Sequence, residues 1–181
     1  PDAPRQSSAG RHFILAQRWP AASCRLSATL GLAMNQGALS EVCEFLNASG
    51  WNYTVFLQAY EAVRTPEAPV EQLVRSALGS DVVFAEMESV SADAVLSEVL
   101  SCLRYAGEAG SGPDPRSIQS ERFAQLVTRA ISEVEAAASK ALRIERFRIT
   151  EGHPAYPVFW DFAFLFAAPD RAEVLIGSSS D

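Results

Sequence analysis

Cysteine, histidine and lysine are scarce in this chain of 181 residues, which has three cysteines, two histidines and one lysine. No C-x-x-C pair occurs among Cys24, Cys43 and Cys102, and an odd number of cysteines cannot all join in internal disulfides. The pattern argues against a zinc ribbon and against a disulfide scaffold. The default interpretation of the three thiols is that they are small apolar side chains.

Long apolar runs are also missing. A membrane-spanning helix requires about 18 consecutive apolar residues. The longest run here, residues 158–168, is interrupted by Asp161. The chain does not open on the basic and then apolar segment of a secretory signal. We therefore expect no membrane partner and, with no paired cysteines, a cytoplasmic protein.

Motifs for a metal or a cofactor are absent, so we predict neither. The only histidines, His12 and His153, form no H-E-x-x-H pattern, and the glycines of residues 107–112 are not followed by the Lys-Ser/Thr pair of a phosphate loop. Glu86, Glu88 and Asp93 form a small acidic group that would suit Mg²⁺ or Ca²⁺. They lack the D-x-D-x-D-G loop, and a solvated acidic face is the simpler interpretation.

Acidic residues are present in excess and are unevenly distributed. The chain has 22 acidic and 15 basic side chains, and residues 67–139 alone hold twelve acidic and five basic ones, a net charge of −7. Nucleic-acid binders need clustered lysine and arginine to neutralise phosphates, so we expect no nucleic-acid partner. A basic protein is the partner that this charge favours, although an acidic surface also serves solubility.

Length and composition indicate one globular α+β domain. Apolar residues make up 48% of the chain, which at this length is enough for a core without staples. Residues 1–10, rich in proline and serine, are predicted to be a disordered arm, and residues 11–181 a single domain. A Gly/Pro-rich connector at 107–115 permits no regular element. It separates a helix-rich N-terminal part from the rest.

Apolar spacing of three and four residues predicts several helices. One begins near Ser40 after a turn at residues 35–37, one runs from Val70 to Gly79, and one is opened by Ser91. The longest is capped by Ser120 and keeps its apolar face from Phe123 to Leu142. Residues 12–19 favour a strand stopped by Pro20, whereas 26–34, 51–57 and 81–87 do not decide between strand and helix.

After this helix the period changes to two, which predicts strands. Residues 143–150 alternate imperfectly, residues 158–168 form an aromatic strand, and a turn at 168–171 leads into residues 173–176. The long helix is expected to pack on this C-terminal antiparallel sheet of at least three strands. The terminal serines are predicted to fray.

The aromatic strand has two unlike faces. Period two places Trp160, Phe162, Phe164 and Phe166 on one face, which we expect to pack under the long helix. Asp161 falls on the other face, among small residues, where a partner or a ligand is able to approach.

The connection before this strand, residues 151–162, is the most unusual segment. Pro154 and Pro157 stiffen it, so it can present His153 and Tyr156 as a recognition surface. His153 and Asp161 are also the one local histidine–carboxylate pair, the arrangement of a general base. The simpler interpretation is a loop histidine that hydrogen-bonds its own backbone.

Three functions remain open. The first is a non-enzymatic acidic protein that masks a partner's surface, and a bacterial immunity protein or an enzyme inhibitor is its specific form. The second is a small hydrolase or transferase that uses His153 and Asp161. The third is a structural subunit of a homo-oligomer. For the first, the predicted partner-binding residues are Glu86, Glu88, Asp93, His153, Tyr156 and Asp161.

Overall fold

The computed structural model describes residues 33–63 and 67–181. The predicted arm at 1–10, the predicted strand at 12–19 and Cys24 lie outside the described residues.

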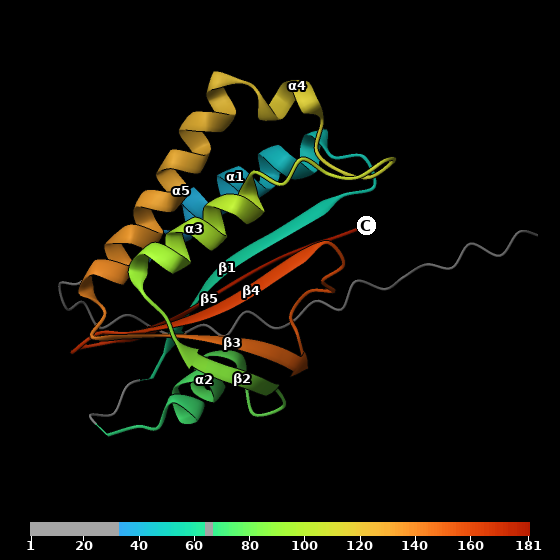
Figure 1. The fold of residues 1–181 in the computed structure, drawn as a ribbon. Coiled ribbons are helices and arrows are strands. Elements are labelled where there is room, and N and C mark those ends of the chain that lie inside the picture. The colour runs from blue at the N-terminus through green and yellow to red at the C-terminus, as the bar shows by residue number, and fades with distance from the viewer. Residues whose placement is uncertain (1–32, 64–66) are drawn as a thin grey trace, which may run out of the picture. The chain divides into compact units, whose positions relative to one another are not determined.

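A five-stranded antiparallel sheet forms the centre of the fold (Figure 1). Two of its strands come before the connector in the chain. The segments at 51–57 and 81–87, which are ambiguous in sequence, therefore contribute to strands. These two are the edges of the sheet. In spatial order the strands are β1 (Thr54–Ala62), β5 (Ala172–Ser180), β4 (Trp160–Ala167), β3 (Arg143–Glu151) and β2 (Val83–Ser89).

Helices cover both faces of the sheet unequally. Figure 1 shows the longer helices above one face of the sheet and the short helix α2 below the other. The predicted α+β class, with a long helix packed on a C-terminal antiparallel sheet, is thereby confirmed. The helices of the larger layer are α1 (Gln36–Ser49), α3 (Ala92–Leu103) and α5 (Glu121–Lys140), the opposite helix is α2 (Val70–Leu78), and α4 (Pro115–Ile118) is one turn before α5.

The start of α1 corrects the sequence analysis. The expected turn at residues 35–37 is the helix N-terminus, because the side chain of Asn35 accepts a hydrogen bond from the backbone N–H of Gly37 at 2.9 Å. Asparagine is as good an N-cap as serine, so a turn-forming residue and a helix cap look alike in sequence. Ser40 lies inside the helix and caps nothing.

The long helix α5 follows its predicted cap. Ser120 accepts from the N–H of Phe123 at 3.1 Å, and Phe123, Val127 and Val134 are buried on its inner face. The helix ends at Lys140, earlier than the apolar spacing predicts. Leu142 is 75% exposed, and its N–H donates to Ala167 of β4.

The aromatic strand β4 packs its rings under the helices, as predicted. Trp160, Phe162, Phe164 and Phe166 form a row with successive centroid distances of 5.9, 5.5 and 6.4 Å. Phe162 faces Gly177 of β5, where any side chain would overlap the ring. Strand β5 stays paired through Ser180, so the predicted fraying is wrong.

The connector at 107–115 is irregular but anchored. The backbones of Trp51 and Gly112 exchange two hydrogen bonds, at 2.9 and 3.0 Å. Gly107 and Gly112 approach so closely that neither position has room for a Cβ. The glycines therefore fold the connector back against the segment that enters β1.

Candidate functional site

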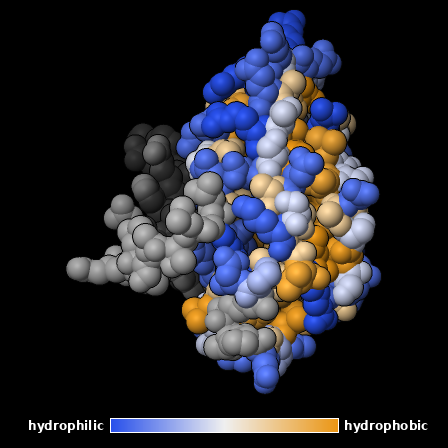
Figure 2. Space-filling model, turned by 90° about the vertical axis from the view of Figure 1, so that its left-hand side faces the viewer, coloured by the Kyte–Doolittle hydropathy of each residue, from blue (hydrophilic) through white to orange (hydrophobic). Residues whose placement is uncertain are grey.

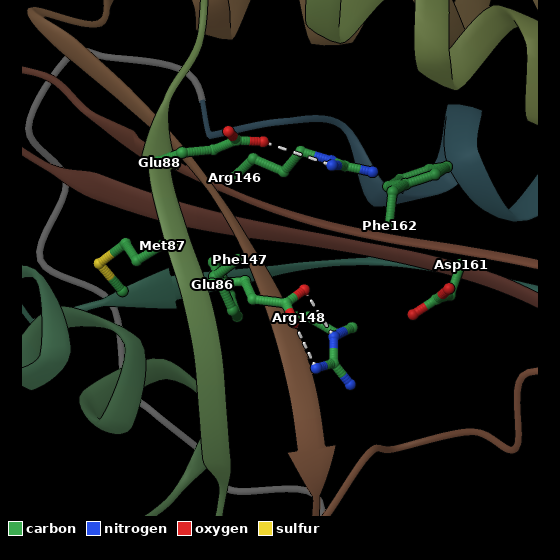
Figure 3. A pocket seen from close by; sticks show the side chains of 8 residues that line it. All are labelled: Glu86, Met87, Glu88, Arg146, Phe147, Arg148, Asp161 and Phe162. Atoms are coloured by element: carbon green, nitrogen blue, oxygen red, sulfur yellow. Dashed lines mark hydrogen bonds and ion pairs between the residues drawn. The ribbon is translucent and has the colours of Figure 1, made fainter.

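A pocket of about 420 Å³ opens in the sheet where β3 and β4 separate (Figure 3). The two strands are in register over only four residue pairs, from Arg143↔Ala167 to Arg146↔Phe164. Beyond these pairs, described β3 residues pair with β2 alone and described β4 residues with β5 alone. Eight residues of β2, β3 and β4 line the pocket: Glu86, Met87, Glu88, Arg146, Phe147, Arg148, Asp161 and Phe162.

A bulge in β2 accompanies this separation. Ala85 pairs with Arg148 and Glu88 with Arg146, so two β2 residues lie opposite Phe147 alone. Glu86 has φ +56°, in the left-handed region that side chains other than glycine seldom adopt. A bulge bends a strand and increases its twist. The bend falls opposite Phe147, the first residue of β3 without a partner on β4.

Both pocket arginines are held by glutamates. Arg148 donates to Glu86 through two nitrogens, at 2.8 and 2.6 Å, and Arg146 donates to Glu98 of α3 at 2.8 Å and to Glu88 at 3.4 Å. The hydrogen bonds from Arg148 lower the pKa of the Glu86 carboxyl, and those to Glu98 raise the pKa of Arg146. Both guanidinium groups are therefore already neutralised within the site.

Asp161 is the third carboxylate of the pocket, and it is not hydrogen-bonded to either arginine. Its exposed side chain extends from β4 toward Arg148 (Figure 3). Within residues 33–63 and 67–181, however, the two pocket arginines donate to glutamates and not to Asp161. The lining includes three carboxylates and two guanidinium groups, and Glu98 adds a fourth carboxylate beside Arg146. The pocket is therefore net negative, with an acceptor group facing solvent.

The prediction that Asp161 lies among small residues describes only one of its sides. Toward β5 it pairs with the small residue Ser178. Toward β3, where the strands separate and Asp161 has no partner on that strand, the pocket is lined by arginine and phenylalanine side chains.

His153 lies in the loop that joins β3 to β4. Its half-buried ring accepts a hydrogen bond at Nδ1 from the N–H of Ala155 at 3.0 Å, the local bond that the simpler interpretation predicts. Burial lowers the pKa of His153, and the negative charge of Asp161 partly opposes this. A nitrogen that accepts from Ala155 does not also donate to a carboxylate. In the described structure, therefore, Nδ1 of His153 does not donate the hydrogen bond to Asp161 that a general-base pair of this kind requires.

Tyr156 and Asp93 lie apart from the pocket lining. Tyr156 is 79% exposed in the same loop as His153. Asp93 is in the first turn of α3, so the structure does not gather it with Glu86 and Glu88. Among residues 33–63 and 67–181, no three His, Cys, Asp or Glu side chains are placed to hold a metal ion.

The acidic segment 67–139 does not form one continuous surface. It contains α2, which lies on one face of the sheet, and α3 and α5, which lie on the other. Figure 2 shows one side of the molecule, on which hydrophilic and hydrophobic side chains are interspersed. The negative charge of the segment is therefore divided between the two faces of the sheet.

The described cysteines are poor nucleophiles. Burial raises the pKa of both Cys43 and Cys102 to about 12. Only the thiolate reacts readily, and its fraction is very small near neutral pH at such values. Neither thiol supplies a nucleophile to the second of the three functions.

Sequence reasoning overlooked five of the eight lining residues, including both arginines. The signal that was present is the spacing of Arg146 and Arg148, which period two places on the same face of an acidic protein's strand. Met87, Phe147 and Phe162 carry no comparable signal, because apolar residues are expected in any strand.

No helix in the described part of the chain is long and apolar enough to cross a membrane. Comparisons with protein-family models, with curated proteins and with solved structures found no match for this chain.

Proposed function

We propose that this protein is a non-enzymatic binding protein that masks the surface of a basic protein partner, as an immunity protein or an enzyme inhibitor does. The pocket between β3 and β4 is the centre of the binding surface. The observation that carries the proposal is the exposed Asp161, which faces solvent in a net negative pocket whose two arginines are already paired. Opposite charge accelerates association and selects the partner.

The loop between β3 and β4 supplies the apolar contacts of the same surface. Tyr156 is 79% and Val158 48% exposed, and Pro154 and Pro157 restrict the backbone that carries them. Exposed aromatic residues on a stiff support lose little conformational entropy on binding and are frequent binding hot spots. The loop connects the two strands that form the pocket, so both features belong to one end of the sheet.

The two alternatives have less support. An enzyme that uses His153 and Asp161 needs the carboxylate to orient the imidazole. Among the described residues, the ring accepts at Nδ1 from Ala155 and forms no hydrogen bond with Asp161. A homo-oligomer built by strand pairing needs an open sheet edge. At the β1 edge, outward-facing backbone groups are already bonded to the side chains of Gln36 and Asn47 of α1. The other edge, β2, is interrupted by its bulge, and a bulge discourages pairing with another strand.

Affinity capture from a lysate of the native source tests the proposal. The full chain serves as bait at low salt and at about 0.5 M salt, because screening weakens attraction between surface charges over this range. We expect one stoichiometric basic protein, retained at low salt and depleted at high salt. Capture of no protein, or of an acidic protein regardless of salt, would contradict the proposal.

A further inference from the structure

The pocket is closed at both ends in the plane of the sheet. At one end β3 and β4 become paired at Arg146 and Phe164, and at the other they are joined by the loop at residues 152–159. An added strand would have to run along the gap and would meet one of these ends. A single side chain, in contrast, enters across the sheet and meets neither. The shape of the gap therefore suits a side chain better than a strand.

The chemistry of the pocket selects the kind of side chain. Asp161 accepts hydrogen bonds and is not engaged by Arg146 or Arg148, which donate to glutamates. An anionic ligand would have to displace Glu86 or Glu98 from its guanidinium and would be repelled by Asp161. A cationic ligand, in contrast, can donate to Asp161 without competing with Arg146 or Arg148 for that carboxylate.

The pocket also has apolar lining residues. Phe147 and Phe162 are almost wholly buried and offer only a small part of their surface, and Met87 of β2 is half-buried. Arginine and lysine bury their methylene stems along apolar surface and keep the charged end near acceptors. A volume of about 420 Å³ is enough for one such side chain.

We infer that the gap between β3 and β4 is a socket for one arginine or lysine side chain of the partner, whose charged group binds Asp161. This inference rests on the proposed function and adds the chemical identity of the contact. The partner presents the side chain on a protruding loop or turn, because the socket is entered across the sheet. The glutamates keep Arg146 and Arg148 from occupying the position of the incoming cation.

Titration of the ¹⁵N-labelled full chain with small probes tests the socket without the partner. The probes are N-acetyl-arginine amide, N-acetyl-lysine amide and the uncharged isostere N-acetyl-citrulline amide. We expect both cationic probes to produce saturable amide shifts centred on Asp161, Phe162 and Phe147 below about 100 mM, since a single side chain binds weakly. The citrulline probe is expected to produce much smaller shifts.

A charge-matched pair of variants assigns the binding to Asp161. Asp161→Asn should weaken both cationic probes by about threefold to tenfold. Asp170→Asn removes the same charge in the β4–β5 turn and should leave both affinities unchanged. Equal effects of the two variants, equal binding of citrulline, or absence of saturable shifts would overturn the inference.

The same variants separate this inference from the proposed function. If lysate capture finds a basic partner that Asp161→Asn binds as tightly as the wild type, the socket is wrong and the masking function stands. If the arginine probe binds at Asp161 but no partner is captured, the socket stands and the masking function fails.

Discussion

At the scale of single residues, Glu173 is a buried carboxylate in β5, only 4% exposed. The backbone N–H of Met34 donates to it at 3.2 Å, and Arg171 lies 3.8 Å away. On the neighbouring strand it faces Glu61, which has the same charge. Burial raises the pKa of Glu173 above its ordinary value of 4.5, and Met34 and Arg171 only partly offset this. The folded state therefore binds this proton more tightly than the unfolded chain does.

Glu173→Gln should make the protein relatively more stable as pH rises. A carboxyl whose pKa is higher in the folded state than in the unfolded one loses stability as pH increases from the unfolded pKa through the folded pKa. Glutamine removes that loss and keeps an acceptor for Met34. Urea unfolding at several pH values should show the free energy of unfolding of the variant, relative to the wild type, increasing from about pH 4 to pH 7. A difference that does not change with pH would show that Glu173 ionises normally.

Gly177→Ala should destabilise the fold by about 1–3 kcal/mol, since overpacking forces neighbouring side chains to move. A Cβ at this position would overlap the ring of Phe162. Denaturant unfolding measures the effect, and the background variant Phe162→Leu provides the control. In that background the smaller side chain relieves the overlap, and Gly177→Ala should cost clearly less. An equal loss of unfolding free energy in both backgrounds would show that overlap with Phe162 is not the cause of the destabilisation.

At the scale of elements, the outer edge of β1 is covered by side chains of α1. Asn47 bonds both the N–H and the C=O of Val55, at 2.6 and 3.1 Å. Gln36 accepts from the N–H of Ala59 at 2.9 Å and donates to the C=O of Leu57 at 3.2 Å. Open strand edges promote association between chains, so these amides protect the fold from edge pairing.

The double variant Gln36→Ala and Asn47→Ala should expose this edge. We expect a lower melting temperature and a mean mass that rises with concentration, because unpaired strand groups seek partners in other chains. Light scattering coupled to size-exclusion chromatography measures the mass. Gln125→Ala, which removes an exposed amide from α5, is the control and should behave as the wild type. A double variant whose mass matches the wild type at every concentration would show that the edge is protected by other means.

At the scale of the whole molecule, sequence periodicity predicts the elements whose neighbours are close in the chain. The helix after Ser120 and the strands at 143–151, 160–167 and 172–180 follow one another and pack together. The segments that form β1 and β2 are ambiguous in sequence, because their strand conformation is stabilised by partners far along the chain. Thr54, for example, pairs with Ser180.

Only part of the candidate site is predictable from the sequence, because the position of the pocket also depends on how the strands pair. Glu86, Glu88 and Asp161 stand out as charges, and they do line one pocket. The pocket itself depends on where β3–β4 pairing stops, which the bulge opposite Phe147 accompanies. A bulge at a glutamate with positive φ has no signature in the sequence, since glycine is the residue that such a backbone favours.

The most direct test of the account compares three baits in quantitative lysate capture: the wild type, a pocket variant and a charge-matched variant. The pocket variant combines Glu86→Gln, Glu88→Gln and Asp161→Asn, and the matched one combines Glu71→Gln, Glu135→Gln and Asp170→Asn at exposed sites outside the pocket. Melting curves establish that all three are folded. We predict that the pocket variant retains about tenfold less of the basic partner, whereas the matched variant retains nearly all of it. Equal retention by the two variants, or no basic partner on the wild type, would contradict the account.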